Sequence, residues 1–161
     1  MQILKYPSPA LFVVCSEVTI FGPELKILLD SMWDAMVEGH GMGLAANQVG
    51  LTFRMFVMLG PDEEKIYLVN PKILSRSIVS ANLPESCLSA PGEMLTLDER
   101  ASWAKIEFQN ETGEKKERIF HGIHSVCVQH ETDHLNGLSH LQSKSIKTAK
   151  RKILAKKWGL R

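Results

Sequence analysis

The sequence predicts a single α+β domain, in which antiparallel β-sheets are arranged around a central helix that bears two histidines. Three observations support this fold class. Helical spacing of apolar residues is confined to a few separate stretches, short strand-like runs and turn signals fill the middle of the chain, and strands do not alternate with helices. The 161 residues, of which 44% are hydrophobic and 23% charged, are enough to bury one core, so we expect one domain over residues 1–161.

The first predicted helix follows an irregular entry segment. Residues 1–21 contain Pro7 and Pro9 and are expected to be extended. Gly22-Pro23 then opens an amphipathic helix, because proline suits the first helical turn and apolar residues recur at three- and four-residue spacing as far as Val37. We expect Gly39 to end this helix.

A glycine-rich stretch, residues 41–50, follows the helix. Its Gly-x-Gly pattern suggests a dinucleotide-binding turn, but that fingerprint follows a strand and opens a helix, and here the order is reversed. We interpret Gly41 and Gly43 as positions where the backbone lies close to a ligand. Gln48 is then an uncharged hydrogen-bond donor at the edge of that cleft, or else an ordinary turn residue.

The middle of the chain is predicted to be β-structure. Residues 53–59 form a buried strand, and residues 66–69 and 72–80 are expected to be two strands because Asn70-Pro71 interrupts them. Residues 103–109 and 115–120 flank a turn and predict a hairpin.

The most informative stretch is Gln129-His130-Glu131-Thr132-Asp133-His134, on a helix expected over residues 122–136. Residues four apart share a helix face, so both imidazoles can reach one metal ion. The glutamate matches the H-E-x-x-H pattern, in which it is the general base for a water molecule that the metal activates. The alternative is a polar turn that binds nothing. The other histidines are expected to be surface or satisfied core residues, namely His40, His121, His124 and His140.

The cysteines Cys15, Cys87 and Cys127 are too few for a disulfide framework. Cys87 is a candidate third ligand, because thiolate and imidazole both bind borderline-soft divalent metals. The alternative for Cys87 is a buried apolar residue. Cys127 lies three residues before His130 and could also be proposed as a ligand, but we expect it to pack beneath the metal.

Charge is distributed unevenly along the chain. The formal net charge is +1, but residues 143–161 carry eight basic residues and no acid, so the rest of the chain has a net charge of −7. A basic helix over residues 145–158 is expected, with either an anionic partner or a solvated face.

No apolar run of membrane-spanning length and no signal-peptide pattern is found, so we expect a cytoplasmic location and no membrane or DNA partner.

Three stretches in this order, residues 41–48, 85–89 and 129–134, resemble the three signature motifs of peptide deformylases. The helix before the first motif and the hairpin before the third also fit, and the resemblance covers nearly the whole chain. It implies a metal-dependent hydrolase that removes the formyl group from the N-terminal formyl-methionine of nascent polypeptides and releases formate.

The resemblance also implies a role for each matching residue. Cys87, His130 and His134 would bind one divalent metal, Fe²⁺ in the cell with Zn²⁺, Ni²⁺ or Co²⁺ as alternatives. Glu131 would transfer protons, and the side-chain amide of Gln48 and the backbone N–H of Leu88 would stabilise the oxyanion. The substrate methionine would enter an apolar slot at Met42, Gly43, Leu88, Ile123 and Val126. Residues 145–158 resemble the basic helix with which bacterial members contact the ribosome.

Some positions depart from the family pattern. Ser86 stands where the second motif usually has glycine, and serine would cost roughly 1–2 kcal/mol if φ there were positive. Met94 stands near the place of an arginine often found soon after this motif, so contacts to the peptide beyond methionine are open. Arg100 matches another family arginine, which is expected to pair with Asp133 behind the metal ligands.

Two other functions were weighed against a deformylase. Another kind of metalloprotease would use the same helix on ordinary peptide bonds, but it does not account for residues 41–48 and 85–89. A non-catalytic module that binds ribosomes or formyl peptides would have no need of Glu131.

Overall fold

Helix α1 (Pro23–Glu38) forms where the apolar spacing predicted it. Pro23 occupies its first turn and Gly39 follows its last residue. Its large buried side chains recur at three- and four-residue spacing, at Leu25, Leu29, Met32 and Met36. The helix therefore has one apolar side, which packs against a sheet.

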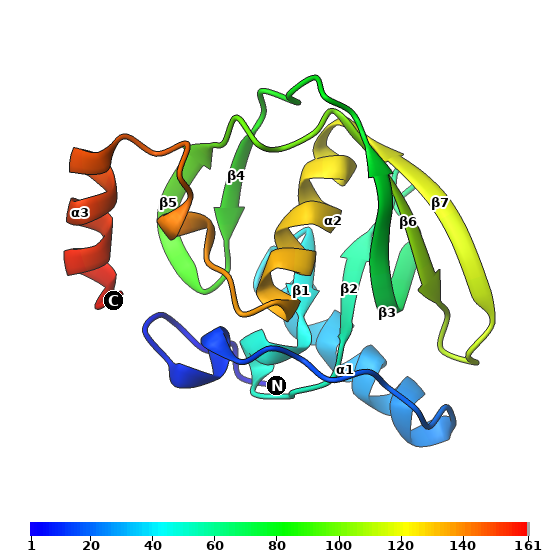
Figure 1. The fold of residues 1–161 in the computed structure, drawn as a ribbon. Coiled ribbons are helices and arrows are strands. Elements are labelled where there is room, and N and C mark those ends of the chain that lie inside the picture. Colours follow the sequence, from blue (N-terminus) through cyan, green and yellow to red (C-terminus); the bar gives the residue numbers. More distant parts are fainter. Residues whose placement is uncertain (161) are drawn as a thin grey trace.

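That sheet has five antiparallel strands in the order β1–β2–β3–β6–β7 in the computed structural model, which describes residues 1–160 (Figure 1). The strands are β1 (Gly43–Ala45), β2 (Met55–Leu59), β3 (Lys65–Arg76), β6 (Trp103–Gln109) and β7 (Lys115–His121). The predicted hairpin of β6 and β7 is confirmed, with Ile106 paired with Arg118. Along β2, Val57 faces α1 and Phe56 faces the opposite layer, so the sheet is apolar on both faces.

The prediction of two strands separated at Asn70-Pro71 is wrong, because β3 runs through both residues. The register shifts between Val69 and Lys72, and Asn70 has a φ of 51°, so the chain forms a bulge here. Proline has no N–H to donate and is tolerated at such a bulge. The side-chain amide of Asn70 bonds the backbone of Val18 in both directions, at 2.8 and 2.9 Å, and so fixes the entry segment on the sheet.

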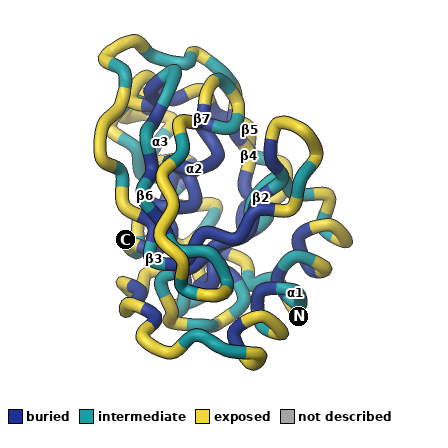
Figure 2. The backbone as a smooth tube through the Cα atoms, turned by 90° about the vertical axis from the view of Figure 1, so that its right-hand side faces the viewer, coloured by how far each residue is buried: buried dark blue, intermediate teal, exposed yellow. Residues whose placement is uncertain are grey.

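Helix α2 (Gly122–Leu135) lies between the five-stranded sheet and a separate hairpin of β4 (Pro84–Cys87) and β5 (Ala90–Thr96) (Figure 1). Most of its residues are buried, and much of its path is dark blue in Figure 2. Polar side chains are placed inside a protein only where partners or a function offset the cost of burying them. The polar residues of α2 are therefore the first place to look for a site, and the predicted α+β fold with a central helix is confirmed.

The last helix, α3 (Thr148–Trp158), begins at Thr148 rather than at residue 145. It is held by an apolar cluster that includes Ile146, Leu154 and Leu95, whereas Ile153 is 66% exposed. The carboxylate of Glu93 on β5 accepts a hydrogen bond from the indole of Trp158 at 3.2 Å. Within residues 1–160, no helix is long and apolar enough to cross a membrane.

Candidate active site

Two segments far apart in the sequence bring three buried metal-ligating side chains together. Cys87 is the last residue of β4, and His130 and His134 lie one turn apart on α2. One ligand atom from each residue lies within 4.8 Å of the other two, and Cys87 Sγ is 3.2 Å from His134 Nε2. All three residues are at most 6% exposed. One thiolate and two imidazoles, buried and converging, fit a divalent transition metal.

Burial sets the protonation of these ligands in the metal-free protein. It raises the pKa of the Cys87 thiol to about 12, with a further contribution from the charge of Glu131. It lowers the pKa of His130 to about 3 and that of His134 well below its usual value. Both histidines are therefore neutral and ready to bind a metal at pH 7, whereas the thiol must lose a proton first.

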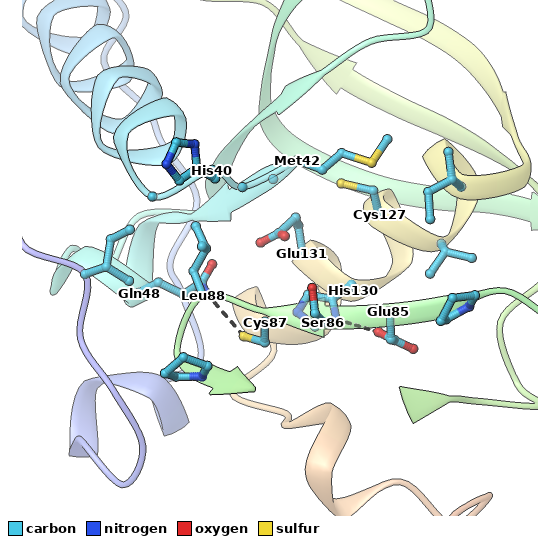
Figure 3. Close-up of a pocket in the computed structure, with 18 of the residues that line it drawn as sticks. His40, Met42, Gln48, Glu85, Ser86, Cys87, Leu88, Cys127, His130 and Glu131 are labelled. Carbon is cyan, nitrogen blue, oxygen red and sulfur yellow. Dashed lines mark hydrogen bonds and ion pairs between the residues drawn. The ribbon is translucent and has the colours of Figure 1, made fainter. Parts of the chain in front are cut away.

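Glu131 lies beside the ligands, with its carboxylate in the middle of the pocket shown in Figure 3. It is 4% exposed, and its Oε2 has no hydrogen-bond partner among the described residues. Burial, followed by repulsion from Glu85, raises its pKa to about 8. A nearby metal cation would lower this pKa again. The carboxylate is thus placed to accept and return a proton near neutral pH.

Gln48 is held in one orientation. Its Oε1 accepts a hydrogen bond from the backbone N–H of Ala45 at 2.8 Å, so its Nε2 faces the ligands and donates to Ser89 Oγ at 3.1 Å. The distance from Nε2 to Cys87 Sγ is 3.6 Å. Leu88 follows Cys87 in the turn between β4 and β5. Donors fixed in this way can stabilise developing negative charge without reorganising.

The pocket has a volume of about 480 Å³. Its walls include the five positions expected to form the methionine slot, which are Met42, Gly43, Leu88, Ile123 and Val126. Cys127 also lines the pocket and is buried, but it does not belong to the group of converging ligands. Gly43 has no room for a side chain, since a Cβ there would lie 2.6 Å from Glu131 Oε1 and 2.7 Å from Cys127 Sγ.

A buried ion-pair network supports His130, and its central residue, Glu85, was not predicted. Glu85 Oε2 lies 2.5 Å from His130 Nδ1, and Arg100 binds both oxygens of Glu85 at 2.8 and 3.0 Å. Arg100 also contacts Asp133 at 2.6 Å, as the family resemblance implied. The outer nitrogen of a ligating histidine usually has such a partner. Glu85 could have been predicted from the two-residue period of a strand, which puts Glu85 and Cys87 on the same face.

His140 was expected to be either a surface residue or a core residue with hydrogen-bond partners. The structure buries it in the core without such partners within residues 1–160. The residue is 3% exposed, and its ring centroid is 5.0 Å from that of His130. Neither ring nitrogen has a hydrogen-bond partner among the described residues. No pattern in the sequence indicates this position, because the segment that bears it meets α2 only in the folded chain.

Ser86 and Met94 lie opposite each other on the β4–β5 hairpin. Among the described residues other than glycine, positive φ angles occur only at His40, Glu63, Asn70 and Asn82. Ser86 is therefore extended and carries no left-handed strain. Met94 is 67% exposed, so the position carries an apolar surface.

Comparisons with known proteins agree on one family. A family model described as polypeptide deformylase matches residues 1–151. The chain is similar to peptide deformylase from Phenylobacterium zucineum, at 40% identity over 85% of this chain and 83% of the relative. It is also similar to a peptide deformylase-like protein from Agrobacterium fabrum, at 36% identity over 97% and 93% of the two chains. Among solved structures, Plasmodium falciparum peptide deformylase with an inhibitor has a TM-score of 0.86 at 35% identity over 98% of this chain and 97% of its own. The Thermus thermophilus enzyme also has a TM-score of 0.86, at 31% identity over 96% and 90%.

Proposed function

Because this chain belongs to the polypeptide deformylase family, we propose that its reaction takes place in the pocket beside Cys87. The chain is a metal-dependent hydrolase that removes N-formyl groups from nascent peptides. The observation that carries this proposal is the convergence of three buried ligands from β4 and α2 next to the buried carboxylate of Glu131. A pure binding protein would not need a buried, unpartnered carboxylate at that point.

Cys87, His130 and His134 would hold the metal. The ligand set accepts several ions, and we propose Fe²⁺ in the cell, with Zn²⁺, Ni²⁺ or Co²⁺ as alternatives. When bound, a divalent metal supplies Lewis acidity, which polarises the formyl carbonyl and lowers the pKa of water. Glu85 would hold the ring of His130 in position through the contact to Nδ1.

Glu131 would carry the protons of the reaction. Its carboxylate takes a proton from the attacking water as the new C–O bond forms at the formyl carbon. It then delivers a proton to the nitrogen as the C–N bond breaks, so that formate and a free amino terminus are the products. Gln48 Nε2 and the Leu88 N–H would stabilise the oxyanion, and removing such a donor typically costs about 3 kcal/mol of the barrier.

The apolar part of the pocket would select the methionine side chain. Met42, Ile123 and Val126 line it, and Gly43 leaves the peptide backbone free to approach the chain closely.

Formate release from formyl-Met-Ala-Ser tests the reaction. We expect release that stops on metal chelation and falls by at least about 100-fold in Glu131→Ala, with metal content and fold unchanged. Unchanged turnover in Glu131→Ala would refute the assigned role. No release from metal-loaded wild-type protein would favour a binding module instead.

We further propose that residues 1–161 act as one catalytic unit in the cytoplasm, and that α3 binds the ribosome. Its exposed lysines include Lys150, Lys152 and Lys156, and no acid lies between residues 143 and 161. Attraction of this face to ribosomal phosphates would be sensitive to salt.

Charge reversal tests ribosome binding better than deletion does. Removing residues 145–161 would also remove Ile146 and Leu154 from the apolar cluster that contains Cys87. Reversal of Lys150, Lys152 and Lys156 to glutamate leaves that cluster intact. A matched variant reverses three exposed bases of the large sheet, Lys72, Arg76 and Lys115. Equal co-sedimentation of both variants with ribosomes at low salt would contradict the proposal.

A further inference from the structure

The two histidine ligands are oriented in different ways. His130 has a charged partner at its outer nitrogen, since Glu85 Oε2 lies 2.5 Å from Nδ1. The Nε2 atom of His134 lies 3.2 Å from Cys87 Sγ, and its buried Nδ1 has no hydrogen-bond partner among the described residues. The outer nitrogen of a ligating histidine usually has a partner that fixes the rotation of the ring. The ring of His134 therefore needs another contact to hold it.

The ring of Tyr6 supplies such a contact. The ring centroids of Tyr6 and His134 are 6.5 Å apart and the two planes differ by 23°, which is an offset-stacked arrangement. Tyr6 is buried, so neighbouring side chains restrict the rotation of its ring. The backbone of the same ligand is also held, because Asn47 Nδ2 donates a hydrogen bond to the carbonyl oxygen of His134.

Tyr6 is itself fixed by several contacts. Its N–H donates to the carbonyl oxygen of Ser89 at 3.0 Å, in the β4–β5 turn two residues after Cys87. Its side chain belongs to the apolar cluster that includes Cys87. Phe12 packs against the Tyr6 ring with a centroid distance of 5.8 Å and an angle of 58° between the planes. Tyr6 is therefore tied to the segments that carry two of the three ligands, Cys87 and His134.

The geometry points to Tyr6 as the positioning residue of His134, with its stacked ring in place of a hydrogen-bond partner at Nδ1. Turning the imidazole would drive its edge into the face of the Tyr6 ring, so the stack holds Nε2 towards Cys87. A ligand held in this way needs no reorganisation when a metal binds. Tyr6 does not line the pocket and has no catalytic role. The inference rests on the proposed function, because it requires His134 to be a metal ligand.

Substitutions of Tyr6 can separate the ring from the hydroxyl group and from burial. Tyr6→Phe keeps the ring, whereas Tyr6→Leu and Tyr6→Met keep an apolar side chain without a ring. Phe120→Leu is the matched control, because it removes a buried ring from an apolar cluster that does not include Cys87. Two measurements report on the metal centre. They are chelator competition for Zn²⁺ and the visible absorption of the Co²⁺-loaded protein, which depends on coordination geometry.

We expect Tyr6→Leu and Tyr6→Met to weaken Zn²⁺ binding by about 10-fold, the lower end of the range for losing the partner behind a ligand. Both should also shift the Co²⁺ absorption. Tyr6→Phe should bind Zn²⁺ within about twofold of wild type and keep the wild-type spectrum, because the ring is retained. Phe120→Leu should lower the free energy of unfolding and leave both metal measurements unchanged.

The inference would be overturned if Tyr6→Leu and Tyr6→Met matched Phe120→Leu in Zn²⁺ affinity and Co²⁺ spectrum, because the ring would then contribute to stability alone. It would also be overturned if Tyr6→Phe lost as much affinity as Tyr6→Leu, because the hydroxyl group would then be responsible. Failure of the wild-type protein to bind Zn²⁺ would instead contradict the proposed function.

Discussion

The substitution Glu85→Gln tests how much the buried ion-pair network contributes to folding stability and to metal binding. Glu85 is 6% exposed and joins Arg100 to His130, with three contacts between 2.5 and 3.0 Å. Glutamine keeps the size of the side chain but removes the charge. Arg100 then keeps a single carboxylate partner, Asp133, and His130 loses a charged acceptor.

The expected magnitudes follow from this geometry. Removing one partner of a buried, hydrogen-bonded ion pair typically costs about 3–5 kcal/mol. Asp133 remains beside Arg100, and glutamine still offers one oxygen, so we expect a loss of about 3 kcal/mol in the free energy of unfolding of the metal-free protein. Loss of the partner of a ligating histidine should also weaken metal binding by about 10- to 100-fold.

Urea denaturation of the metal-free protein and chelator competition for Zn²⁺ measure these two effects separately. Glu117→Gln is the matched control, because Glu117 forms a surface pair with Lys105 at 2.5 Å with side chains that are 49% and 37% exposed. Such a pair is worth less than about 1 kcal/mol and is remote from the ligands. The reasoning would be refuted if Glu85→Gln lowered stability and Zn²⁺ affinity no more than Glu117→Gln does.

Three further predictions concern the same region. Gly43→Ala should reduce formate release at least about tenfold, because its Cβ would displace the carboxylate of Glu131, which lies 2.6 Å from that position; wild-type turnover would show that the pocket can yield. His140→Phe should stabilise the metal-free protein by about 1–2 kcal/mol in urea denaturation, since it removes two buried, unpartnered nitrogens, and a destabilised variant would imply that they have partners. Burial lowers the pKa of His140 to about 3, so below about pH 6.5 the unfolded chain binds a proton at this residue and the folded chain does not. The free energy of unfolding of the metal-free protein should therefore fall by up to about 1.4 kcal/mol per pH unit at this residue as the pH is lowered. Urea midpoints between pH 7.5 and 5 should fall less steeply in His140→Phe, and equal slopes would exclude this group as the cause.

The sequence determined those features that depend on local spacing. Apolar residues three and four apart specify α1, and Pro23 and Gly39 mark its ends. The turn between residues 109 and 115 specifies the hairpin of β6 and β7. The four-residue spacing of His130 and His134 places both on one face of α2, so the candidate metal site was visible before any tertiary contact was known.

Tertiary structure decided which distant residues meet. No local pattern could show that Glu85 would bridge Arg100 and His130, that His140 would be buried against a metal ligand, or that Leu88 would rest on Gly39 and Gly41. The bulge that carries β3 through Asn70-Pro71 likewise depends on hydrogen bonds to Val18, which is remote in sequence. Spacing fixes the direction in which a side chain leaves its own helix or strand, whereas packing between elements fixes what it encounters.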